Sequence, residues 1–386
     1  MGSQRIARRI RAVPPSGIRR FFDIAASMPD VISLGVGEPD AMTPAEIRAA
    51  GQRSIDQTTA YTSNSGLLEL RVTLAAHLNR LYGADYDPED ELLMTVGASE
   101  AMLIAALAVL DPDDEVLVPE PCFVAYPAAV LFADAKPVYV PTCVEDSFQV
   151  SGAALEAAIT PRTKAIVIGY PNNPTGAVLS RERMLEVAAV AERHDLLVIS
   201  DEIYDRLVYG VEHTCFAALP GMRERTILIG GFSKAYAMTG WRLGWLAASA
   251  EITAAARKVH QYAIMSAPTM SQYAGLAALR FGEASVRAMR DEYDRRRRII
   301  VGGLRQIGLP TFEPRGAFYA FPSIGHLGMS SEEFCERLLT EERVAVIPGD
   351  AFGPSGAGYV RVCYAASLDK IEAALERIER LVRRVT

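Results

Sequence analysis

Residues 229–244 read IGGFSKAYAMTGWRLG, and Lys234 stands near the middle of this stretch. Only five of the 40 basic residues are lysines, and the other four stand at the starts of apolar runs or in helical stretches: Lys136, Lys164, Lys258 and Lys370. Lys234 instead follows the apolar run 226–229 and is bracketed by glycines and a serine. Burial there would disfavour its charged form. A neutral amine can form a Schiff base with a carbonyl, which is the chemistry of pyridoxal 5'-phosphate (PLP) enzymes.

The segments around this stretch predict an α/β fold. Short apolar runs without polar alternation are typical of strands buried on both faces of a mostly parallel sheet. Such runs occur at residues 91–97, 116–118, 137–140, 165–168, 196–200 and 226–229. Helices are predicted between them at 99–110 and 181–194, the second with Ser180 as its N-cap.

The pattern of predicted elements changes after about residue 284. A highly charged helix at 287–304 is followed by strand-like segments at 316–321, 344–347 and 359–364, and a last helix carries Ile371, Leu375, Ile378 and Leu381 on one face. We therefore expect a large domain over residues 41–284. A smaller α+β domain would combine residues 285–386 with residues 1–40, which include an N-terminal arm and a helix around Phe21–Ile24.

Composition excludes several classes of protein. The net charge of −7 argues against a nucleic-acid binder, and no segment approaches the ~20 apolar residues of a membrane span. Five scattered cysteines, an odd number, predict a reducing cytoplasm, and they form no metal-ligand spacing with the histidines. An arginine-rich N-terminus admits a transit peptide, although we favour a surface arm: Arg5, Arg8, Arg9, Arg11, Arg19 and Arg20.

Asp201 follows the most apolar predicted strand. Open α/β sheets bind ligands outside the carboxyl ends of their strands. An aspartate at such a position can hold a pyridinium nitrogen protonated, so that the ring acts as an electron sink. The same residue could equally be a helix N-cap.

The string YPNNPTG, residues 170–176, also follows an apolar strand. Asn173 can donate a hydrogen bond to a phenolate oxygen. The Asn173–Pro174 bond is a candidate cis peptide. An ordinary turn is the alternative, because asparagine, proline and glycine dominate turns.

Two further segments carry groups that suit anions. Gly97, Ala98 and Ser99 lie where a strand feeds a helix, and free N–H groups at a helix start can cradle a phosphate, although Ser99 could be only an N-cap. Ser233 and Arg242 would complete that site.

Arg361 stands in an apolar strand, where an arginine is costly without an anionic partner. That partner would be a substrate carboxylate or a structural carboxylate of the protein.

Taken together, these segments resemble the class I/II aminotransferases of PLP fold type I, in their order and spacing and over nearly the whole chain. The segments SLGVGEP at 33–39, NNPTG at 172–176, SDEIY at 200–204 and SK…GWRLG at 233–244, with the Arg361 strand, carry the resemblance. It implies a PLP-binding large domain, a small domain and a ping-pong exchange between an L-amino acid and a 2-oxo acid.

The resemblance also implies a role for each site residue. Lys234 is expected to be the Schiff-base lysine and proton shuttle, and Asp201 the partner of the pyridine nitrogen. Asn173 and Tyr204 would donate to the cofactor's O3′, and Phe123 would lie against its ring. The expected phosphate site is Ala98, Ser99, Ser233 and Arg242, with Tyr61 reaching the phosphate of the other subunit in a homodimer. Gly37, Asn173 and Arg361 are expected to contact the substrate carboxylate.

Substrate choice depends on one departure from the family. Aspartate-preferring members resemble one another in a lysine that here corresponds to Ser99, followed by Glu100. The segments 35–40 and 237–242 look closest to archaeal-type aromatic aminotransferases. An aromatic or broadly hydrophobic donor with 2-oxoglutarate as acceptor is therefore favoured. The alternatives are an aspartate-preferring aminotransferase and a PLP-dependent lyase or synthase; a PLP-binding transcription regulator is disfavoured by the acidic net charge.

Overall fold

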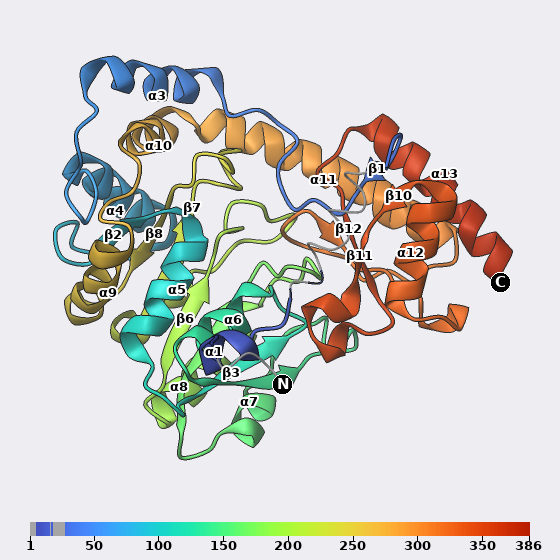
Figure 1. The fold of residues 1–386 in the computed structure, drawn as a ribbon, viewed down its shortest axis with the longest axis horizontal. Helices are drawn as coiled ribbons and strands as arrows, with labels where there is room; N and C mark the ends of the chain where they lie inside the picture. The colour runs from blue at the N-terminus through green and yellow to red at the C-terminus, as the bar shows by residue number, and fades with distance from the viewer. Residues whose placement is uncertain (1–4, 16, 18–27) are drawn as a thin grey trace.

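The computed structural model describes residues 5–15, 17 and 28–386 (Figure 1). The helix expected around Phe21–Ile24 lies outside the described residues. A short N-terminal helix, α1 (Arg8–Ala12), packs near α6 (Ala125–Phe132), where Arg8 pairs with Asp134 at 3.3 Å.

A seven-stranded sheet forms the centre of the molecule, in the order β2-β8-β7-β6-β5-β3-β4. The β7–β6–β5–β3–β4 neighbours are parallel, and β8 is antiparallel to both β7 and β2. The sheet is therefore mostly parallel, as the apolar runs predict. Its strands are β2 (Leu92–Thr95), β3 (Glu115–Glu120), β4 (Lys136–Pro141), β5 (Thr163–Gly169), β6 (Leu197–Asp201), β7 (Thr226–Gly231) and β8 (Gly244–Ala247).

Both faces of this sheet are covered by helices (Figure 1). Alternate residues of β5 show how: Ala165 and Val167 pack with α5 and α6, whereas Ile166 and Ile168 pack with α7 and α8 on the other face. Because both sets of side chains are buried, the strand needs no polar alternation. The helices of this region are α3 (Ala45–Gln57), α4 (Leu68–Tyr82), α5 (Gly97–Val109), α7 (Gly152–Ala158), α8 (Arg181–Arg193), α9 (Ala250–Ala263) and α10 (Thr269–Phe281).

The C-terminal part has a core of its own. The long helix α11 (Glu283–Gln306) leads out of the sheet region and packs against α13 (Leu368–Val385) (Figure 1). Ile371, Ile378 and Leu381 are buried, and Leu375 packs against them, as the spacing predicts. The remaining elements are α12 (Ser331–Glu342), β9 (Tyr319–Ala320), β10 (Val344–Ala345), β11 (Ile347–Pro348) and β12 (Val360–Cys363).

The chain's first described strand, β1 (Ile32–Ser33), joins this C-terminal part by pairing in parallel with β10. Leu34 belongs to the same core. The division at residues 41 and 284 stays a prediction.

Several predicted boundaries were wrong by a few residues. Helix α5 begins at Gly97 rather than Ser99, because Val96 is its N-cap, and Ser99 therefore lies inside the helix. The strand predicted at 316–321 is reduced to Tyr319–Ala320, and that predicted at 344–347 is split into β10 and β11. Ser180 does cap α8, accepting a hydrogen bond from the Arg183 N–H at 3.2 Å.

Candidate functional site

A cavity of about 510 Å³ lies at the carboxyl ends of the parallel strands, between the sheet region and the C-terminal part. Every predicted site residue except Tyr61 lines it: Gly37, Ala98, Ser99, Phe123, Asn173, Asp201, Tyr204, Ser233, Lys234, Arg242 and Arg361. Because these residues come from distant segments, the sheet topology is what brings them together.

Lys234 lies just after β7 and its ammonium group is enclosed. Its Nζ donates to the carbonyl oxygen of Gly37 at 2.5 Å and lies 5.7 Å from the Tyr204 ring centroid. Burial lowers the pKa of Lys234 to about 8, because little solvent stabilises its charge. The neutral amine that Schiff-base chemistry requires is therefore populated near neutral pH.

Asp201 is the last residue of β6 and is buried. Its carboxylate accepts hydrogen bonds from the Tyr126 hydroxyl at 2.9 Å and from the Ile203 N–H at 3.1 Å. Burial raises the pKa of Asp201 to about 6. Among the described residues, no lysine or arginine forms an ion pair with it. The carboxylate thus closes an Asx-type turn and remains available to a cation in the cavity.

Two tyrosines that line the cavity, Tyr204 and Tyr319, pack against each other. The Tyr204 and Tyr319 hydroxyls lie 2.7 Å apart, and their rings meet edge to face at 5.9 Å. Phe123 meets the ring of Tyr126 in the same manner at 5.9 Å. These aromatic pairs give the cavity rigid apolar walls whose hydroxyl groups point at fixed partners.

Arg361 is 2% exposed and lies in β12. Its guanidinium donates to Asn173 Oδ1 at 2.8 Å and to the Gly35 carbonyl at 2.6 Å, while its Nε has no partner. No carboxylate among the described residues pairs with it. The structural salt bridge that could explain a buried arginine is absent from the part of the chain that the structure describes.

The Asn173 turn differs from expectation in one respect. The Asn173–Pro174 bond is not cis; the cis bonds are Glu120–Pro121 and Tyr170–Pro171. The turn closes through Asn172, which accepts from the N–H groups of Thr175 and Gly176 and reverses the chain without a cis bond at Pro174. Because Asn173 Oδ1 already accepts from Arg361, its amide NH₂ group is left to donate.

The start of α5 has the features that an anion cradle requires. The first N–H groups of a helix have no intrahelical acceptor, and at α5 the N-cap side chain supplies none either. Arg242 crosses this turn so closely that a Cβ on Gly97 would lie 2.6 Å from its guanidinium. Only glycine, at φ +74°, allows that approach.

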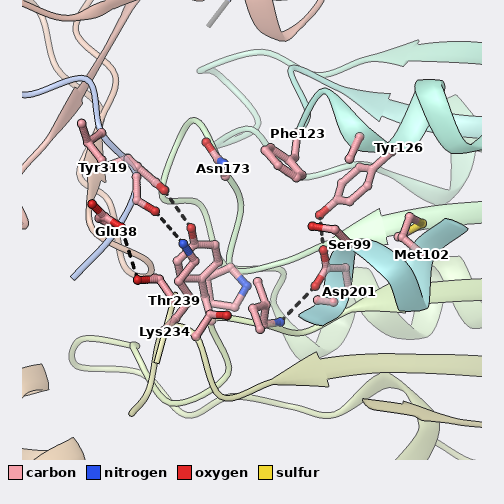
Figure 2. A pocket seen from close by; sticks show the side chains of 18 of the residues that line it. Glu38, Ser99, Met102, Phe123, Tyr126, Asn173, Asp201, Lys234, Thr239 and Tyr319 are labelled. Carbon is pink, nitrogen blue, oxygen red and sulfur yellow. Dashed lines mark hydrogen bonds between the residues drawn. The ribbon is translucent and has the colours of Figure 1, made fainter. Parts of the chain in front are cut away.

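Figure 2 shows how the walls are divided. Ser99, Met102, Tyr126 and Asp201 lie on one side, and Tyr319, Glu38 and Thr239 on the other. The Thr239 hydroxyl donates to Glu38 at 3.2 Å, which joins segments 201 positions apart.

The residue patterns missed Tyr126, Tyr319, Glu38 and Thr239. Tyr126 follows the predicted Phe123 by three residues, a spacing that places both on one side of a helical turn, and this signal could have revealed it. Glu38 and Thr239 stand within the segments 33–39 and 233–244, in which no role was assigned to them, and Tyr319 carried no local signal.

Tyr61 is the exception among the predicted residues. Its side chain is 82% exposed and does not line the cavity of its own chain. The neighbouring segment is nevertheless held firmly, because Gln272 bonds to the Leu67 N–H and to the Thr62 hydroxyl.

Known proteins resemble this chain along nearly its full length. The aminotransferase class I and II family matches residues 29–378. The chain is 46% identical to an aspartate aminotransferase of Pyrococcus abyssi and 44% identical to aromatic-amino-acid aminotransferase 2 of Thermococcus litoralis, over 97% of both chains in each case. The solved structure of Thermus thermophilus aspartate aminotransferase with maleate gives a TM-score of 0.94 at 38% identity, covering 97% of this chain and 99% of that one.

The chain belongs to the class I and II aminotransferases. Its fold is the α/β fold of that family, and the enzyme is a PLP-dependent aminotransferase. The cavity fits this cofactor in three respects: a half-buried lysine with a lowered pKa, a buried carboxylate without an ion pair among the described residues, and a helix start without a side-chain cap beside an arginine. Among the described residues, no helix has both the length and the apolar character needed to span a bilayer.

Proposed function

We propose that the enzyme transfers the amino group of an aromatic or broadly hydrophobic L-amino acid to a 2-oxo acid such as 2-oxoglutarate. The supporting observation is the composition of the cavity wall. Beyond the polar residues discussed above, the wall is apolar or aromatic: Val36, Ala98, Met102, Phe123, Ala125, Pro171 and Ile203. Such a wall suits a ring or an aliphatic side chain.

The cations of the cavity support the same choice. Of the lysines and arginines that the structure describes, Lys234, Arg242 and Arg361 line it. We assign Lys234 to the reacting centre, Arg242 to the cofactor phosphate and Arg361 to the substrate α-carboxylate. No cation among the described residues that line the cavity then remains for a second carboxylate, and Ser99 stands where a lysine would supply one. The distal carboxylate of 2-oxoglutarate would have to be met by neutral donors such as Ser99 or Thr239.

In the mechanism that follows, bound PLP supplies an aldehyde that joins the substrate nitrogen and a ring that withdraws electrons from Cα. Arg361 grips the α-carboxylate through two N–H groups, and the Asn173 amide adds a third donor. The substrate is thereby oriented before any bond breaks. Lys234 would take the proton from Cα as a general base and deliver it, as a general acid, to the cofactor carbon C4′.

The remaining residues of the cavity are assigned to the ring, the phenolate oxygen and the phosphate of the cofactor. Asp201 would hold a proton on the ring nitrogen, because a buried carboxylate without a cation is stabilised by a positive partner. Tyr204 and Asn173 would donate to the phenolate oxygen O3′, and Phe123 would lie against the ring. Ala98, Ser99, Ser233 and Arg242 would hold the phosphate.

We also propose a cytoplasmic homodimer. Tyr61 is exposed, yet it stands on a segment held by Gln272, as a residue that contributes to a neighbouring subunit's site would. All five cysteines are free, which suits a reducing compartment. Loss of PLP affinity in Tyr61→Phe only in the dimer, measured by sedimentation and cofactor titration, would support this arrangement.

The substrate assignment is tested by measuring kcat/KM for phenylalanine, tyrosine and aspartate with 2-oxoglutarate. The two relatives named for aspartate and for aromatic amino acids are almost equally similar to this chain, so only measurement separates them. We expect phenylalanine to exceed aspartate by roughly tenfold or more, since an unpaired carboxylate in an apolar cavity is costly. A preference for aspartate would refute the assignment.

Ser99→Lys sharpens this test. The new cation should raise kcat/KM for aspartate relative to phenylalanine by roughly tenfold, or about 1.4 kcal/mol. Ser99→Ala is the matched control, because it removes the hydroxyl without adding charge. If both variants change the ratio equally, charge at this position does not control the choice.

A further inference from the structure

A buried contact between a glutamate and a histidine lies directly behind the proposed phosphate cradle. Glu100 is in the first turn of α5, one residue after Ser99, and its Oε1 lies 2.6 Å from Nδ1 of His260 on α9. His260 is completely buried, and its Nε2 has no partner among the described residues. The contact with Glu100 is therefore the polar interaction that fixes this ring.

The second oxygen of Glu100 acts on the turn that leads into the helix. Oε2 accepts a hydrogen bond from the N–H of Val96, the N-cap residue, at 2.5 Å. The Thr95 hydroxyl donates to the Gly97 carbonyl in the same turn at 3.0 Å. The Glu100 carboxylate thus links the N-cap residue of α5 to the first turn of the same helix and, through His260, to α9.

This turn has little freedom to shift. Gly97 is in the left-handed region and lies against the Arg242 guanidinium, so a small displacement would change the distance between that cation and the N–H groups of Ala98 and Ser99. Hydrogen bonds from a rigid donor set depend steeply on distance and angle. The groups that hold the turn therefore control how well the cradle matches an anion.

We propose that Glu100 and His260 are positioning residues for the phosphate group of PLP. They act through Val96 and the first turn of α5, without contact to the cofactor. This inference rests on the proposed assignment of Ala98, Ser99 and Arg242 to the phosphate. The proposal assigns a positioning role to His260 on α9, a helix that does not line the cavity.

The test compares two ligands that differ only in the phosphate. Cofactor-free full-length enzyme is titrated with PLP and with pyridoxal, and the ratio of the two Kd values is measured for wild type, Glu100→Ala and His260→Gln. A displaced cradle should weaken PLP binding at least tenfold and change the Kd of pyridoxal less than twofold. A purely structural role would weaken both ligands alike, and that result would overturn the inference.

A conservative variant and a control at a distant site complete the test. Glu100→Gln keeps an acceptor for the Val96 N–H, so it should retain most of the preference for PLP, and it replaces Glu100→Ala if that variant unfolds. Glu156→Ala is the matched control, because Glu156 contacts His194 at 2.7 Å on the opposite side of the sheet and should leave both Kd values unchanged. If wild type binds PLP no more tightly than pyridoxal, the phosphate assignment itself fails. If wild type prefers PLP and the variants keep that preference, the positioning role alone fails.

Discussion

Arg297 and Arg361 are both buried arginines, yet their surroundings differ. Arg297, on α11, is 8% exposed and pairs with Asp294 at 2.8 Å and with Glu313. Arg361, on β12, is 2% exposed and is met only by neutral oxygens and by the rings of Tyr319 and Phe352, whose centroids lie 4.6 and 4.9 Å away. The charge of Arg297 is neutralised within the protein, whereas that of Arg361 has no carboxylate partner among the described residues.

The same contrast marks the rest of the cavity. Lys234 donates only to a carbonyl, and Asp201 accepts only from a hydroxyl and an N–H group. Buried charges normally come paired, because desolvation costs several kcal/mol per ion. Arg71 and Glu120 are also buried without an ion pair among the described residues, but they do not line the cavity. The cavity differs in that Lys234, Asp201 and Arg361 lie around one space.

The largest effect is expected at Lys234. Lys234→Ala should lower kcat by ~10³-fold or more, because it removes the group that moves the Cα proton. The measurement is the production of phenylpyruvate from phenylalanine in a single turnover. Lys136→Ala is the control, since Lys136 is exposed and pairs with Glu115 at 3.2 Å. A Lys234→Ala enzyme that keeps a tenth of the wild-type rate would contradict the assignment.

Replacing Arg361 by alanine should mainly affect substrate binding, whereas replacing Arg297 by alanine should mainly affect stability. Arg361→Ala should raise KM for every amino acid roughly 30-fold or more, the equivalent of the 2–5 kcal/mol that such a buried contact carries. Arg297→Ala should leave KM within twofold and lower the free energy of unfolding by about 1–3 kcal/mol, because it strands two carboxylates. Steady-state kinetics and urea unfolding of both variants measure this. Equal losses of stability would erase the distinction between the two regions.

The sequence predicted the catalytic face of the fold well, for physical reasons. The runs 196–199 and 227–229 are apolar throughout, which is typical of central strands, and the polar residues that follow such strands meet at one edge of the sheet. Lys234, Asp201 and Asn173 were expected together on this ground, and all three line the cavity. The bounds of the short strands β9 to β11 were predicted wrongly, because two residues carry no periodic signal.

Other parts of the site depended on contacts that no local pattern encodes. Tyr319 and Tyr204 are 115 positions apart, and Glu38 and Thr239 are 201 apart. The Asn173–Pro174 bond was a wrong prediction because composition alone cannot tell which of several X–Pro bonds is cis. Side-chain pairing across domains is decided by the whole packing, which only the structure supplies.

The pH dependence of stability gives the smallest and most specific test of unpaired charge. Burial raises the pKa of Asp201 to about 6, whereas the unfolded chain has an ordinary aspartate pKa of about 4. Between these values the folded cofactor-free enzyme binds more protons than the unfolded chain, so Asp201 makes stability fall as pH rises from about 4 to about 6. Above pH 6 the loss is complete, and a shift of about two pKa units corresponds to at most about 3 kcal/mol.

Asp201→Asn cannot titrate, so the cofactor-free variant should match wild type near pH 4 and become the more stable protein as pH approaches 7. Urea unfolding of both proteins across this range gives the difference directly, and the exposed Asp195→Asn serves as a control that should run parallel to wild type. Bound PLP should remove or reverse the difference, because its ring nitrogen supplies the cation that Asp201 lacks. Parallel curves for Asp201→Asn and wild type would mean that the carboxylate is already compensated within the protein, and the comparison between paired and unpaired charges would no longer hold at this residue.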